Sequence, residues 1–222
     1  MKFLEKASDV ISEEGITSFF RKVLKFIALN LVRIRRVNIY ELNLEDSVRR
    51  ILPQVKISFR LAEVTDIESM DEENYGYNSE AKKYSVERLK KGDECVLALY
   101  NGKIAGYMWI MKGYMELSQF KHIRVPKNRA YIYNGFVLKE FRGKRILNAM
   151  DTFVIEKLRK EDKKYLVTTV AQDNKSPVKA RDRMGFKKVG EIIAFKALGY
   201  QYSYVPKKSL DYITKEVSKE CE

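Results

Sequence analysis

The segment YIYNGFVLKEFRGKRIL, which spans Tyr131–Leu147, decides the fold. Its first half predicts a strand over 130–138, and Gly143 opens a predicted helix over 143–160. A helix N-terminus offers unpaired backbone N–H groups and a partial positive charge. A glycine there lets an anion approach the backbone closely, and the basic run 142–145 adds full positive charges. The junction therefore predicts a cradle for a pyrophosphate group, with an ordinary surface turn as the alternative.

Around this segment the sequence predicts a regular succession of elements. Strands are predicted at 56–62, 95–100, 104–111, 114–125, 165–171, 186–195 and 201–205, and helices at 65–70, 79–91, 176–184 and 209–218. Asn101-Gly102 predicts a type I′ hairpin turn, because both residues readily adopt positive φ. A strand–helix–strand crossover makes its two strands parallel neighbours. We therefore expect an α/β fold with a mixed, mostly antiparallel central sheet, helices on both faces and an additional N-terminal amphipathic helix.

The N-terminal part of the chain is strongly basic. Residues 15–40 contain six Lys or Arg and no Asp or Glu. On a helical wheel the apolar residues share one stripe, and most basic residues lie on the other side. This pattern predicts a basic amphipathic helix over 16–36, which is typical of a membrane-surface anchor; the alternative is that the stripe packs on the protein's own core. The predicted divisions are an N-terminal helical segment (1–50), a central domain (51–206) and a C-terminal tail helix (207–222).

Composition restricts the partners. The 222 residues carry a formal net charge of +13, which favours anionic ligands, although a Lys-rich surface alone is the alternative.

Two Cys and one His are too few for a four-ligand zinc site, so no metal is expected. The low Cys content indicates a cytoplasmic setting, peripheral to the inner face of a membrane if the N-terminal helix binds lipid. No apolar run reaches the roughly 18 residues of a membrane span. Nucleic acid is not an expected partner, because the chain has neither an aromatic RNA-binding signature nor a recognisable helix-turn-helix.

Two motifs together resemble the GCN5-related N-acetyltransferase (GNAT) family. The family pattern Gln/Arg-x-x-Gly-x-Gly/Ala begins at Arg142, while Arg145 and Leu147 stand where small residues are usual. Asn174 and the pair Gly185-Phe186 match the second motif. The resemblance implies a GNAT-like domain over 51–206, with acetyl-CoA or another acyl-CoA as cosubstrate, an amine as acceptor and no metal. The residues that it implies for coenzyme binding are Phe136, Val137, Leu138, Arg142, Gly143, Lys144, Arg145, Ile146, Leu147 and Asn174.

The resemblance also implies how the reaction proceeds. The amine attacks the thioester directly in a ternary complex, and the backbone N–H of Val137 donates to the thioester carbonyl. The family's usual acid is a Tyr seven residues after the Asn, and this position is Arg181, which is not a proton donor near neutral pH. At the position of Tyr131 the family often has a carboxylate that acts as the general base. Our catalytic candidates are Glu116, Tyr131 and Tyr133, and the alternative is that they are an ordinary strand carboxylate and packed aromatics.

A second function stays open at this point. A protein of the same fold that binds acyl-CoA but has little activity would act as a sensor or docking module, including at a membrane surface. The replacement of the usual Tyr by Arg181 favours this alternative.

Overall fold

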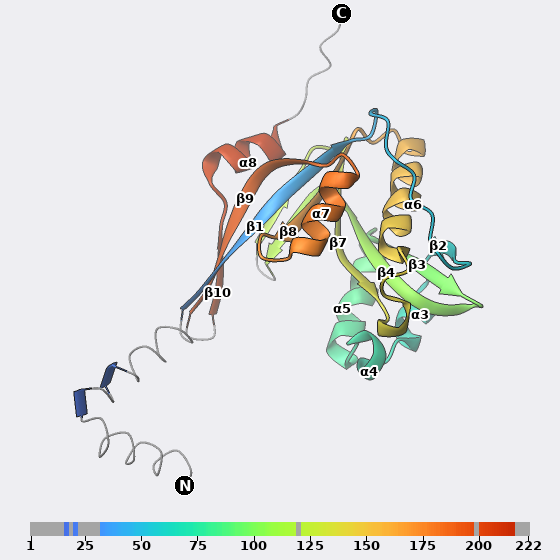
Figure 1. Ribbon diagram of the computed structural model, residues 1–222, viewed down its shortest axis with the longest axis horizontal. Helices are drawn as coiled ribbons and strands as arrows, with labels where there is room; N and C mark the ends of the chain where they lie inside the picture. Colours follow the sequence, from blue (N-terminus) through green and yellow to red (C-terminus); the bar gives the residue numbers. More distant parts are fainter. Residues whose placement is uncertain (1–15, 18–19, 22–31, 119–120, 198–199, 216–222) are drawn as a thin grey trace, which may run out of the picture.

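The computed structural model describes residues 16–17, 20–21, 32–118, 121–197 and 200–215 (Figure 1). Its strands are β1 (Val32–Asn43), β2 (Ser58–Leu61), β3 (Glu94–Tyr100), β4 (Lys103–Lys112), β5 (Tyr114–Ser118), β6 (Lys121–Arg124), β7 (Arg129–Val137), β8 (Tyr165–Ala171), β9 (Lys187–Ala197) and β10 (Tyr200–Tyr204). Its helices are α3 (Val64–Ser69), α4 (Glu72–Tyr75), α5 (Ser79–Lys90), α6 (Ile146–Lys160), α7 (Lys175–Arg183) and α8 (Lys207–Thr214), with a 3-10 turn η1 (Lys139–Phe141).

Most described strands join one large sheet. Its eight strands have the order β10-β9-β1-β8-β7-β4-β3-β2, and β5 and β6 form a separate two-stranded sheet. All neighbours in the large sheet are antiparallel except β7 and β8, which are parallel and are connected through α6. The predicted mixed, mostly antiparallel sheet is confirmed. The β3–β4 hairpin turns at Asn101 and Gly102 with φ of 49° and 77°, as a type I′ turn requires.

Helices cover both faces of this sheet (Figure 1). Successive residues of a strand point to opposite faces, so Ile39 and Tyr40 of β1 belong to different hydrophobic clusters. Tyr40 shares its cluster with Met150 of α6, and α7 packs against the same cluster. Ile39 shares the opposite cluster with Ile213 of α8. A third cluster packs α3 and α5 on β3 and β4, around the fully buried Ile67.

β1 corrects the predicted N-terminal segment. Residues 32–36, expected to end a helix, begin a strand that pairs with β8 on one edge and β9 on the other. The stretch Val32–Ile39 carries four β-branched residues, which favour a strand, and pairing on both edges satisfies its backbone groups. The boundary expected at residue 51 is therefore wrong, because β1 is an inner strand of the sheet. Ile16, Thr17, Phe20 and Arg21 are helical, and the rest of the predicted helix up to residue 31 lies outside the described residues.

The C-terminal helix also belongs to the domain. α8 begins at Lys207, and its Ile213 is fully buried against the β1 face of the sheet. The helix was expected to begin at Ser209, whose Oγ instead accepts a hydrogen bond from the backbone N of Glu191 on β9 at 3.1 Å. The predicted separate tail at 207–222 is therefore wrong for the described part of α8.

Two other local expectations need correction. The strand expected over 114–125 is the two strands β5 and β6, which pair with each other as a hairpin. The helix expected to begin at Gly143 begins at Ile146, because Gly143 and Arg145 both have positive φ, 79° and 59°. Helices α4 and η1 were not predicted, and both are too short for a periodic apolar pattern.

Candidate active site

The parallel strands β7 and β8 separate halfway along their length. They pair from Arg129 opposite Tyr165 to Ile132 opposite Thr168, and no pair follows. Asn134 and Gly135 of β7 are exposed, although β7 is an inner strand of the sheet. A cavity of about 540 Å³, which we call the strand cavity, lies here between the ends of β7 and β8. One backbone edge of β7 is therefore open to an extended ligand.

A bulge changes the direction of β7 at this point. The register with β4 shifts between Tyr107 and Trp109, and Asn134 has a φ of 48°. Gly135 follows the bulge, and a Cβ there would lie 2.8 Å from Leu147 Cδ1. On β4, a Cβ at Gly106 would lie 2.5 Å from the carbonyl O of Phe136. The two glycines let β4, β7 and α6 approach closely around the open edge.

The start of α6 forms a second cavity. The first backbone bond of the helix runs from Ala149 N to Arg145 O at 3.0 Å, so the amides of residues 146–148 have no carbonyl partner within the helix. No side chain caps this end of the helix. A cavity of about 440 Å³, which we call the cradle cavity, opens there. Its lining includes Gly143 and Arg145, so main-chain donors and positive charge meet as the sequence predicted.

Val137 connects the open edge to the cradle. The amide of Leu138 donates to the carbonyl of Ala105 on β4 at 2.9 Å. Because successive amides of a strand point to opposite edges, the amide of Val137 points to the open edge. Its carbonyl accepts a hydrogen bond from Arg142 Nε at 3.1 Å, which closes the turn between β7 and α6.

This geometry agrees with a comparison against protein families. The model of the acetyltransferase (GNAT) family matches residues 61–186 of the chain. The chain belongs to this family. No curated protein matches the chain.

Solved structures show the same fold. The crystal structure of a GCN5-related N-acetyltransferase from Sphaerobacter thermophilus superposes with a TM-score of 0.56 at 14% identity, over 83% of this chain and 56% of that one. A GNAT acetyltransferase from Colwellia psychrerythraea gives 0.53 at 13%, over 82% and 61%. A tandem GNAT protein from the clavulanic acid biosynthesis pathway gives 0.54 at 14%, over 88% and 60%. The chain thus spans less than two thirds of the length of each of these proteins.

Most residues that the GNAT resemblance implied for coenzyme binding line the two cavities. Phe136, Val137, Arg142, Gly143, Arg145, Ile146 and Leu147 line the cradle cavity, and Asn174 lines the strand cavity. The other two lie elsewhere. The Leu138 side chain is buried, and the ammonium of Lys144 lies over the ring of Phe141 at 5.0 Å.

The structure separates the three catalytic candidates. Tyr133 lines the strand cavity, and its ring stacks on that of Tyr131 at 5.6 Å. Tyr131 is buried, and its hydroxyl lies 2.7 Å from Thr169 Oγ1 of β8. Glu116 lies on β5, opposite His122 of β6, in the separate two-stranded sheet. The structure therefore brings Tyr131 and Tyr133 together beside the gap, whereas Glu116 belongs to another sheet.

Arg181, seven residues after Asn174, lies between the two cavities and lines both. Its Nη1 lies 2.7 Å from Oδ2 of Asp151 on α6, and the two side chains are 8% and 2% exposed. Burial raises the pKa of Asp151, although the neighbouring guanidinium opposes this shift. Nε of Arg181 and Oδ1 of Asp151 are buried without a hydrogen-bond partner among the described residues. Both members of this buried ion pair line the cradle cavity, and Arg181 alone also lines the strand cavity.

Sequence reasoning missed Asp151. It lies four residues after Leu147 and three before Val154, so it falls beside the apolar stripe of α6, and this position was the available signal. It also missed the arginines at 49 and 183, which line a neighbouring cavity.

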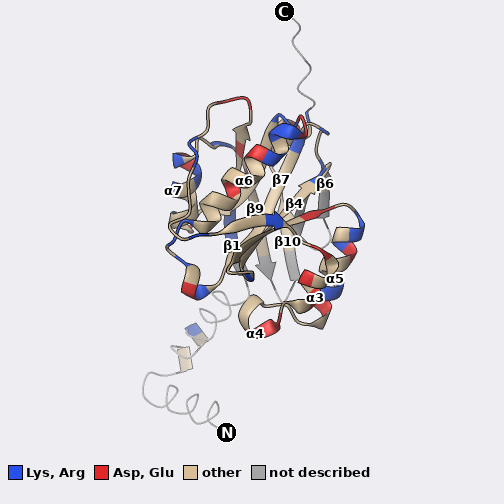
Figure 2. Ribbon diagram, turned by 90° about the vertical axis from the view of Figure 1, so that its right-hand side faces the viewer, with Lys and Arg blue, Asp and Glu red and all other residues tan. Residues whose placement is uncertain are grey.

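The surroundings of the site are basic. α7 carries four Lys or Arg residues along its length, whereas the short helix α4 carries acidic ones (Figure 2). Within the described ranges there is no cluster of three or more His, Cys, Asp or Glu side chains that would hold a metal ion. In the same part of the chain no helix is both long and apolar enough to cross a bilayer.

Proposed function

We propose that this protein transfers an acyl group, acetyl or another, from coenzyme A to a primary amine. The observation that carries the proposal is the connection between the two cavities. The strand cavity and the cradle cavity share Gly135, Leu147, Pro177 and Arg181. In acyl-CoA an extended, amide-containing arm carries the thioester, and a pyrophosphate follows it. The open edge of β7 and the start of α6 present matching groups in the same order.

The backbone supplies most of the binding chemistry. The amides of residues 146–148 and the positive end of α6 bind the pyrophosphate. The open edge of β7 pairs with the amides of the extended arm. The amide of Val137 donates to the thioester carbonyl and stabilises the oxyanion that forms when the amine attacks.

Arg181 acts on the leaving group in this proposal. The amine nitrogen bonds to the carbonyl carbon, the C–S bond breaks, and the thiolate leaves with the electron pair, while the proton that the nitrogen loses passes to water. A guanidinium does not protonate the thiolate at neutral pH, but a cation in a site of low dielectric stabilises its charge. Tyr133 lines the same cavity, and we assign it to position the attacking amine.

Release of free thiol from acetyl-CoA in the presence of a panel of amines tests this function. Tyr133→Leu, which removes the ring that lines the strand cavity, should lower kcat/KM by roughly tenfold if that ring positions the acceptor. Tyr131→Leu is the matched control, because Tyr131 is the stacked neighbour that is absent from the described lining of this cavity. Absence of thiol release with every amine, while coenzyme A still raises the melting temperature, would refute acyl transfer.

The alternative is a sensor that binds acyl-CoA and turns it over weakly. The observation that favours it is the Arg181–Asp151 ion pair, which leaves no proton donor at the usual position. One variant distinguishes the acyltransferase from the sensor. Arg181→Tyr should raise the rate of thiol release if the protein is a sensor that lacks only the acid, and should lower it if the guanidinium stabilises the thiolate.

We also propose that the N-terminal segment contacts a membrane surface, at its cytoplasmic face. Ile16 and Phe20 are helical and 60% and 58% exposed, beside Arg21. Co-sedimentation with anionic vesicles should favour the full chain over a chain that begins at residue 32, which keeps β1. Equal binding of the two chains would exclude this contact.

A further inference from the structure

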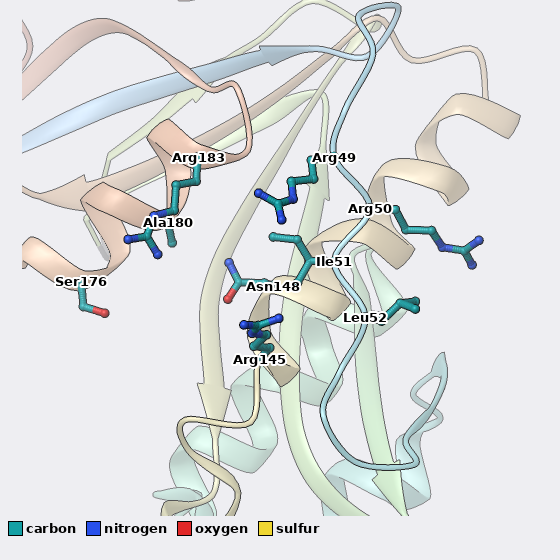
Figure 3. A pocket seen from close by; sticks show the side chains of 9 residues that line it. All are labelled: Arg49, Arg50, Ile51, Leu52, Arg145, Asn148, Ser176, Ala180 and Arg183. Carbon is teal, nitrogen blue, oxygen red and sulfur yellow. The ribbon is translucent and has the colours of Figure 1, made fainter.

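A third cavity lies beside the start of α6 and is lined by arginines. Its volume is about 490 Å³, and its nine lining residues include Arg49, Arg50, Arg145 and Arg183 but no Asp or Glu. Figure 3 shows Arg49, Arg145 and Arg183 around the hollow, whereas the guanidinium of Arg50 points away from it. We call this hollow the arginine cavity.

Three different parts of the chain contribute these charges. Arg145 is the N-cap of α6, Arg183 ends α7, and Arg49 lies on the segment between β1 and β2. Two hydrogen bonds hold that segment against α6. The backbone N of Ile51 donates to Thr152 Oγ1 at 3.2 Å, and the backbone N of Gln54 donates to the carbonyl of Lys144 at 3.0 Å. Arg49 also lies before the stretch 61–186 that the GNAT family model matches.

Arg49, Arg145 and Arg183 have no acidic partner among the described ion pairs of the chain. Their neighbour Arg50 does have one, because its Nε lies 3.4 Å from Glu156 Oε1. Guanidinium groups that line one hollow without a counter-charge repel one another, and an anion that enters the hollow relieves the repulsion. A phosphate monoester, with a charge of roughly −1.5 to −2 at neutral pH, matches several guanidinium groups best.

The position of the arginine cavity indicates which phosphate of acyl-CoA it would bind. The arginine cavity shares Arg145, Asn148, Ser176 and Ala180 with the cradle cavity and shares no lining residue with the strand cavity. The three cavities thus follow one another in a row. In acyl-CoA the thioester arm, the pyrophosphate and the 3′-phosphorylated ribose follow one another in the same order. We propose that Arg49, Arg145 and Arg183 bind the ribose 3′-phosphate and make the protein select 3′-phosphorylated donors; this inference rests on the proposed function.

Binding of coenzyme A and of 3′-dephospho-coenzyme A to the full chain, measured by isothermal titration calorimetry, tests the inference. We expect coenzyme A to bind on the order of tenfold more tightly, because the two ligands differ only in one charged phosphate. Arg49→Gln and Arg183→Gln should weaken coenzyme A binding and leave dephospho-coenzyme A within about twofold. Arg50→Gln is the matched control and should retain the preference, since its guanidinium faces Glu156.

The possible results distinguish a failure of the 3′-phosphate site from a failure of the proposed acyltransferase function. Equal affinity of the wild-type protein for the two ligands, or a preference that survives Arg49→Gln and Arg183→Gln together, overturns the 3′-phosphate site but leaves the acyltransferase proposal standing. Failure of both ligands to bind overturns the proposed function and the inference with it. The melting temperature of each unliganded variant should equal that of the wild type, because the side chains of Arg49 and Arg183 are exposed.

Discussion

Removal of residues 1–50 should unfold the protein rather than release an intact domain. β1 lies between β8 and β9, so its loss leaves each of these strands without a partner along one edge and divides the sheet. The deletion also removes Ile39, Tyr40, Leu42 and Leu44, which are between 0% and 4% exposed. At about 1.5–3 kcal/mol for each buried side chain, these four contribute about 6–12 kcal/mol. That is comparable with the whole unfolding free energy of a domain, about 5–15 kcal/mol.

The matched control is a chain that lacks only residues 1–30 and so retains β1. Thermal unfolding followed by circular dichroism, with and without coenzyme A, compares the two shortened chains with the full one. We expect a cooperative transition for the chain that begins at residue 31 and none for the chain that begins at residue 51. A cooperative melt of the shorter chain at the same temperature would refute the assignment of β1 to the domain.

A single substitution tests the same reasoning within the intact chain. Glu41 of β1 accepts a hydrogen bond from Arg129 Nε of β7 at 2.9 Å, and the two side chains are 5% and 1% exposed. Breaking a buried pair costs about 3–5 kcal/mol. For a protein of this size Glu41→Gln should lower the melting temperature by roughly 6–20 °C. The control Glu45→Gln removes the exposed pair with Lys164 and should cost about 0–1 kcal/mol.

Three further predictions concern single residues. Gly143→Ala meets no atom within 4 Å but must adopt a φ of 79°, so we expect a loss of about 1–2 kcal/mol, seen as a lower melting temperature; an unchanged value would show that the turn rearranges. The guanidinium of Arg60 lowers the pKa of Asp66. The ion pair therefore stabilises the fold at pH values above the ordinary pKa of an Asp side chain, and this stabilisation is lost as the pH falls through the lower pKa of Asp66 in the folded protein. The difference in melting temperature between wild type and Asp66→Asn should therefore shrink below about pH 4, and a constant difference down to acid pH would contradict the linkage. Burial raises the pKa of the Cys95 thiol, so in a Cys221→Ser background DTNB at pH 8 should react only after unfolding in urea, and rapid labelling of the folded protein would show that the strand opens.

The open start of α6 could be predicted because the features that produce it are local, whereas its role as a pyrophosphate cradle stays a prediction. A strand, a basic glycine turn and a long helix are adjacent in the sequence, and the donors are backbone groups whose availability follows from the helix end itself. The turn at Asn101-Gly102 was predictable for the same reason. Side-chain identity matters little for such features, so Arg145 and Leu147 in place of small residues did not prevent the prediction.

Features that depend on contacts between distant elements were not predictable. The Arg181–Asp151 ion pair joins α7 to α6 across a separation of thirty residues, and the sequence around either residue does not indicate its partner. Glu116 was a reasonable candidate only while 114–125 was expected to be one strand next to the site. The hairpin of β5 and β6 places it in a separate small sheet instead.

The wrong N-terminal prediction and the missed arginine cavity have a common physical cause. Once β1 takes its place beside β8, the chain must leave the sheet at Leu44 and cross α6 to reach β2. Arg159 of α6 fixes the start of this crossing, because its Nε and Nη2 donate to the carbonyls of Leu44 and Asp46, each at 2.7 Å. The bonds at Ile51 and Gln54 fix its end. Arg49 lies between these anchors, so its position beside Arg145 follows from the pairing of a strand that a helical wheel had assigned to a separate segment.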